Sequence, residues 1–427
     1  MLQSEANATQ IRDASRVVRM IRDSGGATRP ALTNELDMGR DALNQRLAQL
    51  TAAGLIVEGD TVASTGGRAP REFTFNTKGG LVLAASAGVT NFSAAITDLD
   101  GEIYASATRA VDASLGPHAA LDAIIETLRD LLIDPAVPDA PAWGLGMSIP
   151  GPVDSSRGIP LHPVVSPGWN KFPVRQYLED ALGIPVWVEN DVALLTLGEL
   201  RKGAGAGHQN FLFVKMGAAI GAGLVSGGRL YRGGDGAAGM LGHVKVSDDP
   251  RIVCVCGHIG CLGSVAGGLG IAHHAAELAA AGQSEHLAQA LAENGSITFF
   301  DVLEGVERGD STSWRLLADA GTTLGGAVAA VVNVFNPSLI ILGGSIPVRS
   351  ELVVSRVKEA VYNQSLPITT HSLVIQTSDL EARAGIVGAA SLVVDEVLQP
   401  TLLRRWFTTE GPAYPALERV RDVAARV

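Results

Sequence analysis

All three cysteines of this 427-residue chain fall within eight residues, at Cys254, Cys256 and Cys261, and His243 lies shortly before them. Three thiolates and one imidazole form a complete tetrahedral ligand set for zinc. A complete set is typical of a structural zinc, because a catalytic zinc keeps one coordination position for water or substrate. We therefore expect one structural zinc ion at this motif.

The glycines of the motif support that expectation. Gly257 and Gly260 allow the chain to fold back, so that the third cysteine reaches a metal held by the first two. The alternative is three small buried residues, since a free cysteine packs like an apolar side chain. His258 and His162 are weaker ligand candidates. Clustered thiols of this kind indicate a reducing cytoplasm.

Composition and charge limit the class of protein. A hydrophobic content of 46% with 50 glycines fits a globular α/β protein, and 427 residues suggest about three domains. No apolar run approaches the roughly 20 residues of a membrane span and no secretory signal is recognisable, so we expect a cytoplasmic protein without membrane contact. Residues 1–80 carry a net charge of +1 and the remainder carries −12, which permits nucleic-acid contact only near the N-terminus.

Residues 1–80 have the pattern of a small helical domain followed by a hairpin. Apolar residues recur at helical spacing in the first segment, and Thr28 caps a second helix that tolerates Pro30 in its first turn. Asp37 occupies the turn position often held by glycine, and Asp tolerates the left-handed conformation better than most residues. The predicted helices span residues 9–23, 28–36 and 40–53, and the predicted strands span residues 55–58 and 72–75.

The order of these elements resembles a winged helix-turn-helix DNA-binding domain. The third helix turns its leucines inward, which leaves Arg40, Asn44 and Gln45 facing outward to bond base edges in the major groove. Arg68 and Arg71 on the predicted wing can reach phosphates or the minor groove. The resemblance implies a double-stranded DNA operator as partner. The alternative is a small helical module whose polar face is only solvated.

The segment from residue 81 to 395 alternates predicted strands and helices, with short glycine-rich turns after several strands. Its landmarks resemble the ROK family of repressors, open reading frames and sugar kinases, and the head adds a resemblance to the N-acetylglucosamine and xylose repressor type. The cysteine motif with its upstream Gly-His is the most specific of them. The landmarks are residues 149–154, Glu189-Asn190-Asp191, residues 236–243, residues 254–261, residues 341–344 and residues 384–390.

The resemblance implies an α/β fold in which a winged helix-turn-helix precedes a two-lobed, actin-like (ribonuclease H-like) body around a sugar-binding cleft. We expect the DNA-binding domain at residues 1–79, the first lobe at 80–191, the second lobe with the zinc motif at 192–395, and a helical tail at 396–427. By resemblance, Asn190 and Asp191 contact the sugar, and His243 both ligates zinc and addresses the sugar. In the family's kinases the Asp191 position is the general base.

Several residues depart from the kinase pattern. Ser86 replaces the carboxylate of the first phosphate turn, and Ala218 replaces the threonine of the second. Because phosphoryl transfer depends on positioning and charge neutralisation around Mg²⁺, we expect no kinase activity, with Asp191 a vestigial base. Met240 and Gly263 replace two sugar-binding carboxylates, so the effector is an unusual sugar derivative or the pocket no longer binds a sugar.

Three functions remain open from the sequence. The leading one is a DNA-binding transcriptional regulator, a repressor, whose body has become a sensor and dimerisation module in a homodimer or higher oligomer. The second is an active ATP-dependent sugar kinase with a DNA-binding head. The third is a protein-binding module that uses residues 396–427, although their apolar side chains more simply pack on the body or a dimer interface. A linker at residues 76–82 would join the head to the body.

Overall fold

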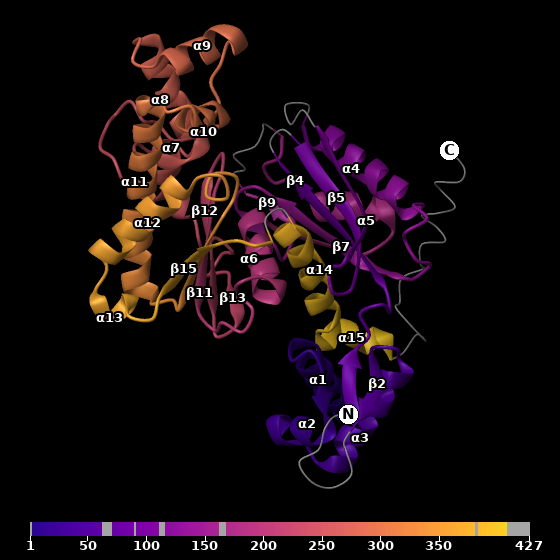
Figure 1. The fold of residues 1–427 in the computed structure, drawn as a ribbon. Coiled ribbons are helices and arrows are strands. Elements are labelled where there is room, and N and C mark those ends of the chain that lie inside the picture. Colours follow the sequence, from indigo (N-terminus) through magenta and orange to yellow (C-terminus); the bar gives the residue numbers. More distant parts are fainter. Residues whose placement is uncertain are drawn as a thin grey trace.

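A computed structural model describes residues 2–61, 71–88, 91–110, 116–161, 168–380 and 383–407 of the chain. The expected fold class is confirmed: a small helical head with a three-stranded sheet precedes a body built on two five-stranded mixed sheets (Figure 1). We call the elements from α1 to β3 the head and the elements from β4 to α14 the body. His162 and Arg68 lie outside the described residues.

The head contains the predicted helix-turn-helix. Its first helix begins at Leu2 rather than near residue 9, and a two-residue strand, too short to leave a sequence pattern, joins the hairpin. Thr28 caps α2 by accepting a bond from the Ala31 amide, and Asp37 adopts the left-handed conformation with φ 48°. The elements are α1 (Leu2–Asp23), β1 (Ala27–Thr28), α2 (Arg29–Leu36), α3 (Arg40–Ala52), β2 (Ile56–Thr61) and β3 (Arg71–Phe75).

The first body sheet has the strand order β10-β7-β4-β5-β6. Its central strand β4 pairs parallel with β7 and antiparallel with β5. The sheet is therefore antiparallel on the β5–β6 side and parallel on the β7–β10 side. Helices α4 and α5 cover one face, and α14 packs on the other. The elements are β4 (Leu81–Ala87), β5 (Asn91–Asp98), β6 (Ile103–Ala110), α4 (Gly116–Leu132), β7 (Ala142–Ile149), β8 (Val153–Asp154), β9 (Ile159–Pro160), α5 (Val174–Leu182) and β10 (Val186–Asn190).

The second body sheet has the strand order β13-β12-β11-β14-β15, and a large apolar core joins one face to α11, α12 and the smaller helices above them. The other face contacts α6, which lies between the sheets against α14 (Figure 1). The elements are α6 (Asp191–Lys202), β11 (Phe211–Met216), β12 (Ile220–Ser226), β13 (Arg229–Tyr231), η2 (Leu241–His243), α7 (Leu262–Ala266), α8 (Gly268–Ala280), α9 (Glu285–Asn294), α10 (Phe299–Glu307), α11 (Ser311–Phe335), β14 (Leu339–Gly343), α12 (Glu351–Gln364), α13 (Pro367–Thr370), β15 (Val374–Thr377) and α14 (Arg383–Val397).

Helix α11 is long and apolar enough to cross a membrane by length and composition alone, although glycines and threonines interrupt its apolar residues in the sequence. In the structure, however, 56% of its most apolar window is buried within the protein. Gly321 and Gly325 face α12 so closely that an added Cβ would approach the side chains of Arg356 and Ala360 within 3 Å. This helix therefore has the packing of a central core helix.

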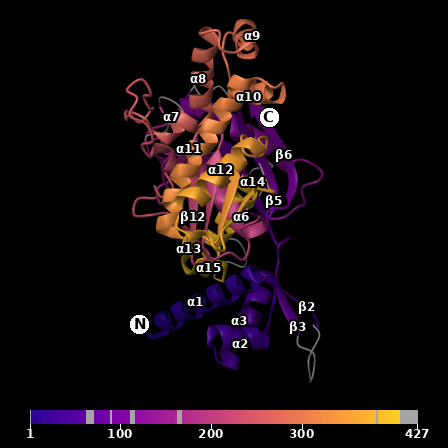
Figure 2. The same cartoon turned by 60° about the vertical axis from the view of Figure 1, so that its left-hand side comes forward.

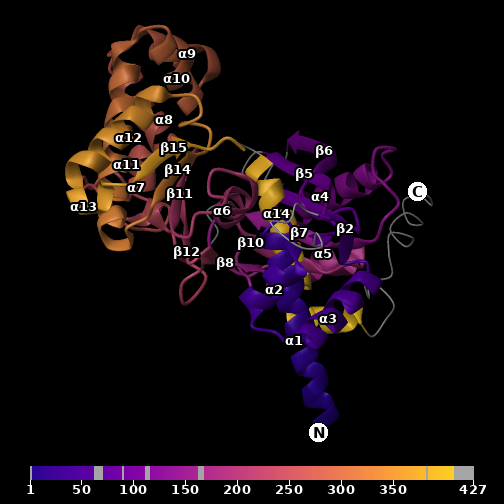
Figure 3. The same ribbon diagram turned by 60° about the horizontal axis from the view of Figure 1, so that its bottom comes forward.

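The head docks on the body through α15 (Pro400–Trp406), the described part of the expected tail (Figures 2 and 3). Trp406 stacks edge-on against Trp143 of β7 at 4.6 Å between ring centroids, and its indole N–H donates to the Ala53 carbonyl. One apolar cluster contains side chains of the head, α14 and α15. The expected linker is also held in place, because the Lys78 ammonium bonds the Asp98 carboxylate.

Candidate functional site

The metal-ligand set expected from the sequence comes together in space. The ligand atoms of His243, Cys254, Cys256 and Cys261 all lie within 4.8 Å of one another. The Cys254 sulfur is 3.6 Å from the His243 Nδ1, and the sulfurs of Cys256 and Cys261 are also 3.6 Å apart. Tetrahedral zinc with bonds of about 2.3 Å to sulfur places two sulfurs about 3.8 Å apart. The cluster therefore fits the size of a zinc ion.

The loop that carries the cysteines folds back as the two glycines predicted. Gly257 and Gly260 both have left-handed φ values, of 87° and 71°. A Cβ on Gly260 would lie 1.8 Å from the Ser247 carbonyl oxygen, so any larger residue would break this close approach. Isolated β-bridges join Val253 to Ile259 and Lys245 to Cys261, which closes the loop on itself. His258 lies beside the cluster, with its Nδ1 3.4 Å from the Cys256 sulfur.

The two buried thiols differ in acidity. Burial raises the pKa of Cys261 to about 12. Burial also opposes ionisation of Cys254, but hydrogen bonds from the Cys256 amide and the Ser264 hydroxyl outweigh it and lower that pKa to about 6. A metal binds the thiolate, and binding releases the thiol proton. Zinc affinity at this cluster should therefore rise with pH.

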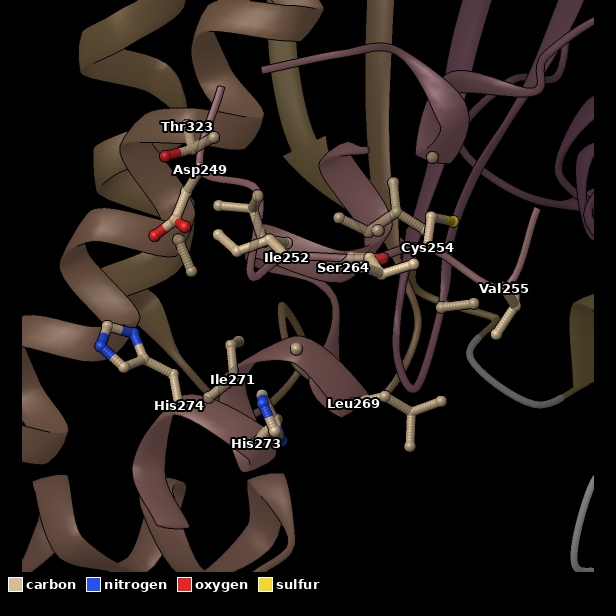
Figure 4. A pocket seen from close by; sticks show the side chains of 18 of the residues that line it. Asp249, Ile252, Cys254, Val255, Ser264, Leu269, Ile271, His273, His274 and Thr323 are labelled. Atoms are coloured by element: carbon tan, nitrogen blue, oxygen red, sulfur yellow. The ribbon is translucent and has the colours of Figure 1, made fainter. Parts of the chain in front are cut away.

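A cavity of about 650 Å³ opens beside the cysteine loop (Figure 4). Its walls come from the turn after β11, the cysteine loop, α8 and α11, and both His243 and Cys254 contribute to them. The walls combine aliphatic side chains such as Ile252 and Leu269 with charged or polar ones such as Asp249 and His274 (Figure 4). Of the four residues expected to bind an effector, only His243 lines this cavity; Asn190, Asp191 and Met240 do not.

Asn190 and Asp191 meet at the junction of β10 and α6. The Asn190 side chain caps α6 by accepting bonds from the Val192 and Ala193 amides, and its own amide group donates to the Gly151 carbonyl. Both ends of this side-chain amide are therefore engaged within the protein. Asp191 begins the helix, and its carboxylate accepts a hydrogen bond from the ammonium of Lys215 in β11.

Sequence reasoning missed Lys215. Its signal was present, because it is the one charged residue in the apolar strand Phe211–Met216, directly before the glycine-rich turn. A second cation binds the residue on the other side of Asn190: Arg232 donates to the buried carboxylate of Glu189, with 2.8 Å between the Arg Nε and the Glu oxygen. Residues near the second sheet thus neutralise both carboxylates that flank Asn190.

The two positions expected at phosphate turns are Ser86 and Ala218, and one position expected to bind a sugar is Gly263. Ser86 is the second-last residue of β4 and pairs with Ser148 of β7, whose hydroxyl donates to the Ser86 hydroxyl at 2.7 Å. Ala218 is exposed at the turn between β11 and β12, and its carbonyl accepts a bond from the Leu269 amide. Gly263 lies in α7, where an added Cβ would be 3.2 Å from the Gly242 carbonyl oxygen. These positions therefore offer hydroxyl and backbone groups only.

The described residues expected to contact DNA lie on the surface of the head. Arg40, Asn44 and Gln45 are exposed on α3, while the leucines of that helix are buried. The Gln45 side chain accepts a bond from Arg46, which restrains it. Arg71 is exposed at the start of β3, and its guanidinium lies 3.8 Å from the Glu58 carboxylate. The negative charge of Glu58 therefore partly compensates the positive charge of Arg71.

A charged cluster joins the head to the body. The Asp395 carboxylate of α14 accepts from Arg22 of the head at 2.6 Å and from Arg201 of α6 at 2.7 Å. The same Arg201 guanidinium lies 2.5 Å from the Asp23 carboxylate of the head. Although burial opposes its ionisation, Arg22 and Arg201 together lower the pKa of Asp395. Three helices from distant parts of the sequence are thus joined through charged groups.

Comparisons with known proteins agree with this geometry. The model of the ROK family matches residues 82–396. The xylose repressor of Bacillus spizizenii is 25% identical over 374 residues, which cover 87% of this chain and 92% of the repressor. A solved ROK family transcriptional regulator, a homolog of the E. coli MLC protein, has 25% identity and a TM-score of 0.79, and the match covers 94% of this chain and 99% of the regulator.

Sugar kinases match a smaller part of the chain. A ROK family glucokinase from Streptomyces griseus, solved in complex with glucose and AMPPNP, has 27% identity and a TM-score of 0.65. That match covers 73% of this chain and 99% of the glucokinase. The repressor-type relatives therefore extend over more of the chain than the glucokinase does. The chain belongs to the ROK family, and it is similar to that family's transcriptional regulators along nearly its whole length.

Proposed function

We propose that the chain is a DNA-binding transcriptional regulator, a repressor, that reads a double-stranded operator through α3. The observation that carries the proposal is the head itself, in which Arg40, Asn44 and Gln45 are exposed on the second helix of a helix-turn-helix. A helix of this kind enters the major groove with its outward side chains toward the base edges. Relatives named as repressors match the chain across head and body.

The test is a selection of random duplex DNA by the purified full-length chain, followed by fluorescence anisotropy with the enriched sequence. We expect enrichment of a palindromic site, because two heads of a homodimer would face successive turns of the duplex. Matched unselected DNA of the same length is the control for charge-driven binding. Equal affinity for selected and unselected DNA would contradict the proposal.

We further propose that the body is a sensor and not a kinase. Ser86 and Ala218 supply no carboxylate or threonine at the phosphate turns, and Lys215 already holds Asp191, the position of the general base. A base engaged by an ammonium is a poor acceptor for a sugar proton. The alternative function, an ATP-dependent sugar kinase, is favoured by the likeness to the glucokinase, and coupled ATP turnover with common hexoses decides between the two.

The cysteine cluster supports a proposal of structural zinc, with His243, Cys254, Cys256 and Cys261 filling all four positions. We also propose that the protein is cytoplasmic and that its domains are residues 1–79, 80–191, 192–395 and 396–427.

The effector would bind near Asn190, Asp191, Met240 and His243. A sugar derivative with few free hydroxyls suits the loss of two carboxylates at Met240 and Gly263. A thermal-shift screen of sugars and sugar phosphates tests this, because a ligand of the native state raises the melting temperature.

A further inference from the structure

Helix α6 is held at its first residue by the second sheet. The Asp191 carboxylate accepts a bond from Lys215, whose neighbours in the sheet register are Gly221 and Gly343. Two flanking glycines leave the lysine chain free of side chains on either strand. Asp191 and Lys215 are 14% and 29% exposed, so the pair is shielded from much of the solvent. The position of Lys215 in the second sheet therefore restrains the first residue of α6 directly.

The same helix is held at its last turn by the head and the rest of the body. Arg201 bonds Asp23 of the head and Asp395 of α14, and Lys202 bonds Asp100 in the β5–β6 turn at 2.7 Å. Arg22 of the head completes the cluster with a side chain only 9% exposed. The Asp23–Arg201 and Arg22–Asp395 pairs tie the orientation of the head to the position of the end of α6, whereas Lys202–Asp100 joins α6 to the first sheet only.

Between its two ends α6 is a continuous helix of 12 residues, capped by Asn190 and packed against α14. Ten helical steps separate Asp191 from Arg201, a span of about 15 Å. A packed helix of this length moves as a rigid element, so a displacement of one end reaches the other.

We propose that α6 couples the Asp191–Lys215 pair to the head: the partner of Asp191 sets the position of Arg201 and thereby how firmly the head docks on the body. In this structure Lys215 is that partner. A ligand hydroxyl that competes for Asp191 would remove the Lys215 contact from the first residue of α6 and loosen the head, while the apolar packing of α6 on the second sheet remains. The inference rests on the proposed function only for the effector as the competing ligand. The coupling between Asp191 and the head can be measured without that effector.

Hydrogen exchange measured by mass spectrometry tests the coupling without an operator or an effector. Lys215→Met removes the ammonium and keeps the length of the side chain. We expect amides in residues 9–23 of α1 to exchange about fivefold faster or more, the lower end of typical allosteric coupling. Lys245→Met is the matched control, because it breaks an exposed pair with Asp248 and should leave α1 unchanged.

A double-mutant cycle separates coupling from general loosening. Arg201→Gln should itself speed exchange in α1, and adding Lys215→Met to it should have little further effect because the connection is already cut. Exchange in α4, which contacts neither pair, is the internal reference. Additive effects of the two substitutions, an equal rise in α4, or no rise in α1 with Lys215→Met would each overturn the proposal. Such a result would leave DNA binding, which has its own selection assay, untouched.

Discussion

Arg201 of α6 and Asp23 of the head form an ion pair with 2.5 Å between nitrogen and oxygen, although 178 residues separate them in the sequence. Asp395 receives the same guanidinium and also Arg22. The head is thus fixed by charge at one corner and by the Trp406 aromatic contact at another. Two independent contacts define one orientation of the head on the body.

Asp395 gives the docking of the head a dependence on pH. Its pKa is below the ordinary value of 3.8 in the folded protein, so its contribution to stability is present above that value. The contribution is lost as the pH falls below about 3.8 toward the lower folded pKa. Asp395→Asn should weaken docking at neutral pH by about 2 kcal/mol, less than a fully buried pair because part of the side chain is exposed.

Hydrogen exchange of α1 between pH 7 and pH 3, corrected for the intrinsic pH dependence of exchange, checks this prediction. The wild-type protein should keep its protection in α1 down to about pH 3.8 and begin to lose it below that value, whereas Asp395→Asn should start with low protection and change less. Asp100→Asn, which removes an exposed carboxylate at the same end of α6, is the control. The same acid response in the wild-type protein and in Asp395→Asn would show that Asp395 is not the titrating group.

Trp406 should be the main apolar anchor of the head. Replacing it with Ala removes its stacking on Trp143 and its hydrogen bond to Ala53, and should destabilise the head by about 3–5 kcal/mol. Thr401→Ala on the exposed face of α15 is the matched control. Chemical denaturation followed by tryptophan fluorescence and by exchange in α1 measures the effect. A loss below about 1 kcal/mol would mean that the head is held elsewhere.

The cysteine cluster should bind about one zinc per chain. His243→Ala and Cys256→Ser should each lose the metal and lower the melting temperature, because metal affinity is coupled to folding. His258→Ala should keep the metal, since His243 completes the set of four. Metal analysis by mass spectrometry and thermal melting check the three variants. Retention of zinc by His243→Ala with loss in His258→Ala would exchange the roles of the two imidazoles.

Features that depend on residues close together in the chain could be predicted from the sequence, and contacts between distant residues could not. The cysteine spacing, the two loop glycines, the Thr28 cap and the turn at Asp37 follow from residues close together in the chain, and the structure contains each of them. The Arg201–Asp23 pair has no such local signal, because nothing at either residue points to the other. Lys215 had a local signal, a charge within an apolar strand, but its partner Asp191 depends on how α6 sits against the sheet.

The wing and the recognition helix should contribute differently to DNA binding. Asn44→Ala should cost about 1–3 kcal/mol and relax sequence preference at one position if the amide reads an adenine. Arg71→Ala should weaken binding evenly across sequences and reduce the salt dependence, as expected for a phosphate contact. Because Glu58 partly compensates the charge of Arg71, the loss of affinity in Arg71→Ala should be modest. Anisotropy titrations at several salt concentrations distinguish the two patterns.

The central claim is that the exposed face of α3 reads a specific operator. Its most direct test is the affinity ratio between selected and unselected duplex DNA at one fixed salt concentration, measured for the wild-type protein and for Asn44→Ala. We predict that the wild-type protein prefers the selected DNA by about 1,000-fold or more and that Asn44→Ala reduces that ratio at least tenfold. A wild-type ratio near one, or a ratio unchanged by Asn44→Ala, would contradict it.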